Sequence, residues 1–290
     1  MRDAKPTRGE RAMTIRGSTR LYAIIGDPIA QVRSPQVFTD RFSASGIDAV
    51  LLPAHVPVDR FDRVVPSLLE LGNLDGLLIT VPFKSRMVAF AQRLGTAAQA
   101  VGAVNALRRE ADGSWSGDMF DGIGFVRGAE RKGKRIRGRR VVLLGAGGAG
   151  SAIASALAEA GVESIDIIDP EVRKARSLVE RLASLFPNCR FNLAQSVTGA
   201  FDMVVNASPV GMQPDDGLPV PMPSLDRSIL VGDVVIRDTP TALIHLAMRS
   251  GCHWVDGRDM HGGQVEAIAN FFASTSSAPI AAPGEPVQPV

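Results

Sequence analysis

Short apolar runs rich in Val, Ile and Leu alternate with helix-length stretches of mixed polarity along most of the chain. This alternation is typical of parallel sheets covered by helices, because parallel neighbours need long crossover connections. The pattern predicts strands at residues 21–25, 50–53, 76–81, 141–144, 164–168, 203–206 and 230–235. It predicts helices at residues 35–45, 61–71, 90–95, 125–132, 150–160, 170–185, 241–250 and 263–273. We therefore expect the α/β fold class.

The chain has 290 residues, more than one hydrophobic core usually serves, so two domains are expected. Eight basic residues lie between positions 127 and 140, directly before the 141–144 strand, and indicate a solvated linker near the main domain boundary. The predicted division is a flexible tail at 1–20, a substrate-binding and catalytic domain at 21–123, a nucleotide-binding domain at 124–252, a C-terminal segment at 253–273 that packs back on the first domain, and a flexible tail at 274–290.

Composition narrows the classes of partner. Apolar residues make up 45% of the chain and charged residues 21%, which is near the globular average and argues against a largely disordered protein. A net charge of +2, with twelve Phe, two Trp and one Tyr, implies no nucleic-acid surface, so a small-molecule partner is expected. No segment reaches the roughly 18 consecutive apolar residues of a membrane span, and a cytoplasmic location is the expectation.

Cysteines and histidines give no sign of a metal site. Cys189 and Cys252 are too few and too far apart for a disulfide framework or a thiolate site, and the four histidines lack metal-ligand spacing. We interpret the histidines as structural. His261 is a possible exception, because it lies close in sequence to other candidate site residues.

The segment Gly145-Ala146-Gly147-Gly148-Ala149-Gly150 directly follows the 141–144 strand and opens a predicted helix. The first glycine permits a tight turn, the second allows a pyrophosphate to approach the backbone, and the third allows the helix to pack closely on the strand. This context predicts a Rossmann dinucleotide-binding domain. The candidate cofactor ligands are Gly145, Gly147, Gly148, Ala149 and Gly150.

Asp169 ends the next strand, 19 residues beyond Gly150, where a ribose-binding acid is expected. A carboxylate there accepts hydrogen bonds from the ribose hydroxyls and repels a 2′-phosphate, so NAD is predicted over NADP. Two alternatives stay open: Asp169 could instead cap the following helix, and the nearby Arg173 and Arg176 could bind a 2′-phosphate.

In the first half of the chain, Thr80-Val81-Pro82-Phe83-Lys84 closes an apolar strand, so Lys84 and the Thr80 hydroxyl lie near a strand's carboxyl end. Ligands of open α/β sheets bind at such ends. A lysine in a cleft loses hydration, which disfavours its ammonium form and makes it usable for proton transfer. The alternative is an ordinary exposed lysine that follows a turn.

Two further segments, Gly102-Ala103-Val104-Asn105 and Gly117-Asp118-Met119-Phe120-Asp121-Gly122, follow in an order that matches one family. The chain resembles the shikimate/quinate dehydrogenases over residues 21–272. Further matches are Ser34-Pro35, Asn206-Ala207-Ser208-Pro209-Val210-Gly211, and Asp256-Gly257 followed by Met260 and Gln264.

The resemblance implies a catalytic pair, Lys84 and Asp121, in which Lys84 takes the hydroxyl proton as hydride passes to the nicotinamide and Asp121 orients substrate and lysine. The substrate ligands that it implies are Ser34, Thr80, Asn105 and Gln264. It also places Asn206 and Ser208 beside the nicotinamide half of the cofactor and Gly257 against the nicotinamide carboxamide.

The activity that the resemblance implies is NAD(P)-dependent oxidation of a cyclic hydroxy-carboxylate, as in aromatic amino acid biosynthesis, by a possible homodimer. A non-catalytic sensor of NAD or of a metabolite, built on the same fold, is the alternative.

Several positions depart from the family's usual residues and leave the substrate open between shikimate, quinate and an analogue. They are Val32 in place of a serine, Met119 and Phe120 before the catalytic Asp, Ala106 after Asn105, and Ile236 in place of a tyrosine. Each polar group lost from a buried site weakens a substrate that needs it by about 1–3 kcal/mol. Arg33 or Arg258 could restore a carboxylate contact, the alternative being that each is a solvated surface arginine.

Overall fold

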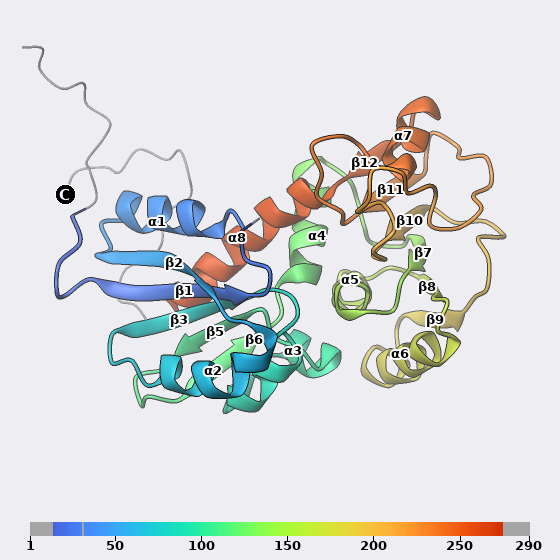
Figure 1. Ribbon diagram of the computed structural model, residues 1–290. Helices are drawn as coiled ribbons and strands as arrows, with labels where there is room; N and C mark the ends of the chain where they lie inside the picture. Colours follow the sequence, from blue (N-terminus) through green and yellow to red (C-terminus); the bar gives the residue numbers. More distant parts are fainter. Residues whose placement is uncertain (1–13, 31, 275–290) are drawn as a thin grey trace, which may run out of the picture.

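The computed structural model describes residues 14–30 and 32–274. Within these residues the chain forms two six-stranded sheets, with helices α4 (Asp121–Arg131) and α8 (Gly257–Ala273) lying between them (Figure 1). The two-domain α/β fold expected from the sequence is confirmed.

The first sheet has the strand order β2-β1-β3-β5-β6-β4. Its strands are β1 (Arg20–Gly26), β2 (Ala49–His55), β3 (Leu74–Ile79), β4 (Arg93–Leu94), β5 (Ala106–Arg109) and β6 (Trp115–Asp118). Strand β1 pairs in parallel with β2 and β3, whereas β5 runs antiparallel to both β3 and β6. The accompanying helices are α1 (Ser34–Ala44), α2 (Phe61–Leu69), α3 (Thr96–Val101), and the short 3₁₀ helices η1 (Val58–Arg60) and η2 (Arg86–Phe90).

The second sheet is entirely parallel, in the order β12-β11-β10-β7-β8-β9. Its strands are β7 (Arg140–Leu144), β8 (Ser164–Ile168), β9 (Arg190–Leu193), β10 (Met203–Asn206), β11 (Leu230–Asp233) and β12 (His253–Val255). Helices α5 (Gly148–Glu159), α6 (Val172–Leu185) and α7 (Ala242–Arg249) accompany it. The strand order reverses between β7 and β10, and the carboxyl ends at such a point form the usual ligand crevice of this architecture.

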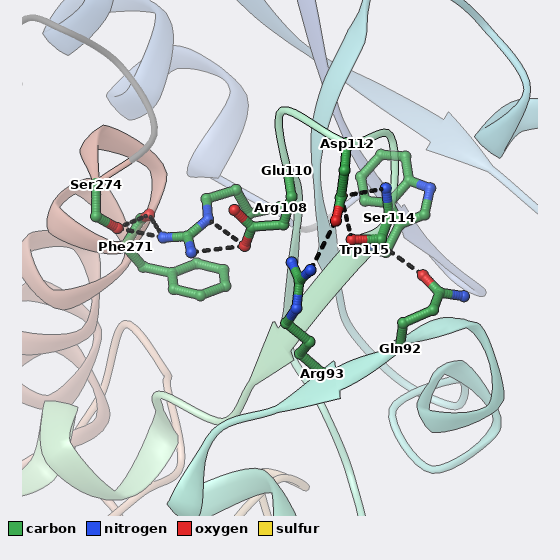
Figure 2. Close-up of polar contacts among 9 residues, drawn as sticks. All are labelled: Gln92, Arg93, Arg108, Glu110, Asp112, Ser114, Trp115, Phe271 and Ser274. Carbon is green, nitrogen blue, oxygen red and sulfur yellow. Dashed lines mark hydrogen bonds and ion pairs between the residues drawn. The ribbon is translucent and has the colours of Figure 1, made fainter.

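Helix α8 belongs to the core of the first sheet although it comes last among the described elements. Phe272 is buried, with its ring centroid 4.9 Å from that of Tyr22 and 6.0 Å from that of Phe38. The Arg108 guanidinium of β5 donates to the Phe271 carbonyl oxygen at 2.5 Å and also reaches the Ser274 hydroxyl (Figure 2). The last turn of α8 is therefore attached to the β5–β6 hairpin.

The start of α8 contacts the second sheet and α4. An added Cβ at Gly257 would lie 2.5 Å from the Val234 carbonyl oxygen, just after β11. An added Cβ at Gly263 would lie 2.3 Å from the Gly124 carbonyl oxygen of α4. Since a side chain would not fit at either point, glycine allows α8 to pass between the two sheets at backbone contact distance.

The helix predicted at residues 90–95 is wrong. Helix η2 ends at Phe90, and β4 then pairs with β6. Figure 2 shows why the segment is extended: Arg93 donates to Asp112 at 2.7 Å, and the Gln92 side chain accepts from the Trp115 amide at 2.6 Å. Contacts with the β5–β6 hairpin therefore override the local helical preference.

Several predicted boundaries also differ from the structure. Helix α4 begins at Asp121 rather than at residue 125, and α8 begins at Gly257 rather than at residue 263. The α8 start is set by a capping box in which Asp256 and Asp259 each accept from the other's backbone amide. The sequence pattern missed the short strands β5, β6, β9 and β12.

The ends of the folded region differ as well. The tail predicted at residues 1–20 extends too far, because Thr19 donates to Asp48 at 2.6 Å and Arg20 is in β1. Residues 1–13 lie outside the described part of the chain. Strand β12 lies beyond the expected boundary at 252 and completes the second sheet. Of the tail predicted at 274–290, only Ser274 is described, and it contacts Arg108.

Candidate active site

A cavity of about 270 Å³ lies at the carboxyl end of β3, between the first sheet, α1 and α8. Its lining includes all six residues that the sequence analysis assigned to catalysis and substrate binding, which are Ser34, Thr80, Lys84, Asn105, Asp121 and Gln264. These residues span 230 positions of the chain, and packing of α8 on the first sheet brings them together.

Asp121 is the hub of polar contacts in this cavity. Its side chain is 5% exposed, and Oδ2 accepts from Lys84 Nζ at 2.7 Å. Oδ1 accepts from Asn105 Nδ2 and from Gln264 Nε2, each at 2.7 Å. Asp121 is also the first residue of α4, and the positive end of a helix dipole stabilises a carboxylate. The carboxylate is thus held in one orientation by three side chains from different parts of the chain.

The orientation of Asn105 is fixed in turn by the backbone. Its Oδ1 accepts from the Phe120 amide at 2.9 Å, so its Nδ2 faces Asp121. Asn105 is 2% exposed, and its side-chain amide bridges the segment before β5 to the start of α4. This bridge places the Asp121 carboxylate at a defined position relative to the end of β3.

Lys84 is held at the opposite side of Asp121. The preceding Phe83 is fully buried, with its ring centroid 4.7 Å from that of Phe61, and the Lys84 carbonyl oxygen accepts from the Val104 amide at 3.0 Å. The Lys84 side chain remains 27% exposed. An anchored backbone with an accessible ammonium group suits a residue that exchanges a proton with a bound oxygen.

His261 also lines the cavity, one helical turn before Gln264. Burial lowers the pKa of its imidazole, although a side-chain hydrogen bond with Gln264 opposes that effect. The sequence analysis named His261 as the possible exception among the histidines, and the structure places it in the cavity lining three residues from Gln264, on the same helix face.

The glycine-rich loop after β7 has the geometry expected of a pyrophosphate cradle. Gly145 has a φ of +103°, which strongly favours glycine. An added Cβ at Gly150 would lie 2.0 Å from the Gly145 carbonyl oxygen, whereas one at Gly147 or Gly148 would meet nothing within 4 Å. The N-terminus of α5 lacks a side-chain cap, so its amides can bind phosphate oxygens. The loop therefore fits the diphosphate of a dinucleotide, with Ala149 in the same first turn.

Asp169 contacts this loop directly. Its Oδ2 accepts from the Ala146 amide at 2.7 Å and its Oδ1 from the Glu171 amide at 2.8 Å. Helix α6 starts at Val172 with Glu171 as the N-cap, so the alternative in which Asp169 caps that helix is wrong. Arg173 and Arg176 are exposed on the first turns of α6. The Asp169 carboxylate therefore lies at the end of β8, and the two arginines are on the helix that follows it.

The loop after β10 lies against the glycine-rich loop. An added Cβ at Gly145 would be 2.9 Å from the Ala207 carbonyl carbon. Asn206 is fully buried, and its Oδ1 accepts from both the amide and the hydroxyl of Ser208, at 3.1 and 2.7 Å. This loop borders the crevice at the point where the strand order reverses.

Asp233 supports the same loop, and the sequence analysis did not single it out. Its carboxylate accepts from Asn206 Nδ2 at 3.1 Å and from the Thr241 hydroxyl at 2.7 Å. Burial is the main effect on this carboxyl and raises its pKa. A carboxylate at the end of an apolar strand was the signal that could have identified it.

Gly257 contacts the next loop. An added Cβ at Gly257 would lie 2.6 Å from Ile236 Cγ1, and Ile236 lines the cavity. Gly257 therefore lies where the second sheet meets the cavity.

In the described part of the chain, no cluster of three or more His, Cys, Asp or Glu residues could hold a metal ion, and no helix is long and apolar enough to cross a membrane.

Each half of the chain matches a known protein family model. Residues 24–107 match the model of the shikimate dehydrogenase substrate binding domain, and residues 123–203 match that of the ThiF family. A shikimate dehydrogenase (NADP(+)) of Rubrobacter xylanophilus is 38% identical over 85% of this chain and 88% of its own length.

Solved structures with a similar fold superpose on almost the whole length of this chain. Shikimate 5-dehydrogenase from Listeria monocytogenes, in complex with shikimate and NAD, superposes with a TM-score of 0.82 at 29% identity, over 95% of this chain and 96% of that one. Quinate dehydrogenase from Corynebacterium glutamicum, in complex with NAD, gives a TM-score of 0.80 at 27% identity, over 90% and 95% of the two chains.

Proposed function

The chain belongs to the shikimate dehydrogenase family and is an NAD(P)-dependent oxidoreductase, and on this premise we propose that Lys84 and Asp121 interconvert a secondary alcohol and a ketone on a cyclic hydroxy-carboxylate. The observation that supports this assignment is the convergence of Lys84, Asn105 and Gln264 on the buried Asp121 carboxylate. A non-catalytic sensor would have no need of an ion pair inside its ligand cavity.

The roles of the two residues follow from their contacts. As the ammonium, Lys84 Nζ donates a proton to the carbonyl oxygen during reduction, and as the neutral amine that this leaves it takes the hydroxyl proton during oxidation. Asp121 holds Nζ toward the cavity, and its other oxygen is occupied by the two amides, so it does not itself need to exchange a proton. The nicotinamide, when bound, accepts or supplies the hydride.

Ser34, Thr80, Asn105 and Gln264 are proposed to bind the substrate's oxygen atoms, since all four line the same cavity. The glycine-rich loop, with Ala149, is proposed to bind the cofactor pyrophosphate. Asn206, Ser208 and Gly257 are proposed to border the nicotinamide half, because the loop after β10 contacts the glycine-rich loop and Gly257 contacts Ile236 of the cavity lining.

For the cofactor we propose a preference for NAD. Asp169 ends β8 beside the glycine-rich loop, and its negative charge opposes a 2′-phosphate. Several relatives are named as NADP(+) enzymes, and Arg173 and Arg176 offer positive charge nearby, so the preference is a specific prediction about this chain. It is tested by comparing kcat/KM for NAD and NADP in one assay, and a higher value for NADP would contradict it.

A Lys84→Met substitution tests the catalytic assignment. Loss of the proton-transfer group is expected to lower kcat by about 10²–10⁴-fold with shikimate, quinate or the best related acid. Lys134→Met, which changes a lysine outside the cavity, is the matched control and should keep the wild-type rate. Cofactor binding and the thermal transition should be retained in both variants, and a Lys84→Met enzyme with the full rate would refute the mechanism.

A further inference from the structure

Strands β10 and β11 end side by side, each with a buried polar residue. Asn206 and Asp233 are partners in the parallel register and are the last residues of their strands. Asn206 is fully buried and Asp233 is 1% exposed. Burial of a carboxylate costs free energy unless its oxygen atoms accept hydrogen bonds, and no basic side chain pairs with Asp233 among residues 14–30 and 32–274. Its hydrogen bonds must therefore offset that cost.

The Asp233 carboxylate accepts hydrogen bonds from three separate segments. Oδ1 accepts from Asn206 Nδ2 and from the Val235 amide, each at 3.1 Å, and Oδ2 accepts from the Thr241 hydroxyl at 2.7 Å. Thr241 also caps α7, because its hydroxyl oxygen accepts from the Ile244 amide at 3.3 Å. A carboxylate has the acceptor capacity for all three donors. Asp233 thus connects the end of β10, the loop after β11 and the start of α7.

The loops that follow β10 and β11 also contact each other. An added Cβ at Gly211, whose φ is +105°, would lie 3.1 Å from Thr241 Cγ2. Arg237 Nη1 donates to the Gly211 carbonyl oxygen at 3.1 Å and to the Gln213 carbonyl oxygen at 2.9 Å. The two loops therefore form one unit, with the Asp233 carboxylate at its base.

Each of these loops borders a different part of the site. The loop after β10 carries Asn206 and Ser208, contacts the glycine-rich loop and is proposed to border the nicotinamide half. The loop after β11 carries Ile236, which lines the substrate cavity. Hydride transfer needs its two reacting carbons about 3–3.5 Å apart. Since Asp233 connects the loop beside the cofactor with the loop beside the substrate, its hydrogen bonds bear on that distance.

From this geometry we propose that Asp233 is a positioning residue for hydride transfer. Because it is buried beneath the two loops, it acts through them and not on the reacting atoms. Its hydrogen bonds hold the loop after β10 and the loop after β11 in one arrangement, and so fix the nicotinamide relative to the substrate cavity. The inference rests on the proposed function, since it takes the loop after β10 as the border of the nicotinamide half.

The test compares two substitutions of Asp233 with one of Asp202. Asp233→Ala removes all three hydrogen bonds, whereas Asp233→Asn keeps an oxygen atom for the two donors at Oδ1. Asp202→Ala is the matched control, because it removes a hydrogen-bonded carboxylate at the opposite end of β10. Each variant is assayed with the best of shikimate, quinate and related acids, with and without deuterium at the carbinol carbon. Binding of ADP-ribose, which has the pyrophosphate of NAD but no nicotinamide, is measured in parallel.

Asp233→Ala is expected to lower kcat by about 10–100-fold, because a small displacement of bound reactants has an effect of this size. The deuterium isotope effect on kcat should rise above the wild-type value, since hydride transfer then becomes slower than product release. The Kd for ADP-ribose should stay within about two-fold of the wild type. Asp233→Asn should keep kcat within about three-fold, and Asp202→Ala should have the wild-type kcat and isotope effect.

The remaining outcomes separate this role from a general structural one. A wild-type kcat in Asp233→Ala, or an equal loss of kcat in Asp202→Ala, overturns the positioning role while the proposed function stands. So does a loss of ADP-ribose affinity in Asp233→Ala that matches its loss of kcat, since the whole nucleotide-binding domain is then disturbed.

A milder variant covers the case in which Asp233→Ala does not fold. Thr241→Val removes only the hydrogen bond to Oδ2 and should lower kcat and raise the isotope effect in the same direction. Wild-type values of both in Thr241→Val overturn the inference. If the wild type oxidises none of the acids with either cofactor, the proposed function fails and the role of Asp233 fails with it.

Discussion

Gly147 and Gly150 belong to the same short motif but have different surroundings in the structure. The space beside Gly147 is open, and its φ of −75° is available to any residue. At Gly150, by contrast, an added Cβ would lie only 2.0 Å from the Gly145 carbonyl oxygen. One glycine therefore leaves room for the cofactor, and the other leaves room for the protein's own backbone.

This difference yields a prediction for two alanine substitutions. Gly150→Ala is expected to lower the free energy of unfolding by about 1–3 kcal/mol, since the methyl group forces α5 away from the loop. Gly147→Ala should change it by less than about 0.5 kcal/mol and should instead weaken cofactor binding. Urea unfolding and a dinucleotide titration measure the two effects, and equal loss of stability in both variants would contradict this account.

At the level of elements, β7 and β10 are joined at their amino-terminal ends by more than backbone pairing, through Arg140 and Asp202. The Arg140 side chain donates to both oxygens of Asp202, at 2.9 and 3.0 Å, and the Arg140 amide donates to Oδ2 at 2.9 Å. These bonds lower the pKa of Asp202 to about 2, mainly through the Arg140 guanidinium. The pair fixes the two central strands of the parallel sheet at the end opposite the cofactor loop.

The lowered pKa implies a pH-dependent contribution to stability. The folded state binds this proton more weakly than the unfolded chain, so the stabilisation is present above the ordinary value of 3.8 and is lost as the pH falls to about 2. Asp202→Asn should therefore cost about 1 kcal/mol near neutral pH, a modest amount because both side chains are more than a third exposed.

Urea unfolding at several pH values between about 3 and 7 tests this sign. The difference in the free energy of unfolding between wild type and Asp202→Asn should narrow as the pH falls below about 4. The exposed control Asp215→Asn should have the same free energy of unfolding as wild type across this range. A gap that widens toward acid pH would refute the assignment.

At the scale of the whole molecule, α4 and α8 connect the two sheets and also hold the site. Asp121 begins α4 and Gln264 is in the middle of α8, and the bond between their side chains crosses the contact between these helices. The helices approach at Gly124 and Gly263, so small side chains here determine whether Gln264 reaches Asp121.

Two adjacent glycines of α8 provide a matched test. Gly263→Ala would place a methyl group 2.3 Å from the Gly124 carbonyl oxygen and is expected to cost about 1–3 kcal/mol of stability and to lower kcat. Gly262→Ala meets only the flexible end of Arg131, at 3.1 Å, and should be neutral or stabilising by up to about 1 kcal/mol. Thermal unfolding and kcat are measured for both variants. If the two variants have the same thermal transition and the same kcat, the contact between α4 and α8 does not control the site.

Local patterns were sufficient for features that neighbouring residues define. The glycine-rich loop was recognisable because an apolar strand, a tight turn and a helix follow one another within a few residues. The segments that contain Lys84 and Asp121 were recognisable for the same reason, because each is a short motif and the resemblance to the shikimate/quinate dehydrogenases covers both domains.

The short strands β4 and β6 were not predictable in this way. Each is four residues or fewer, and β4 is extended because Arg93 and the neighbouring Gln92 bind Asp112 and Trp115 of the β5–β6 hairpin. Local propensity alone is a weak determinant of such segments.

The sequence by itself thus determined the α/β class, the two domains and six of the residues that line the cavity, which are Ser34, Thr80, Lys84, Asn105, Asp121 and Gln264. Only the tertiary structure decided that Arg33 and His261 lie in that cavity and that Arg258 does not, because these positions are more than 200 residues apart or are paired elsewhere. Long-range packing of α8 against α1 and α4 fixes such contacts, and no pattern of neighbouring residues encodes it.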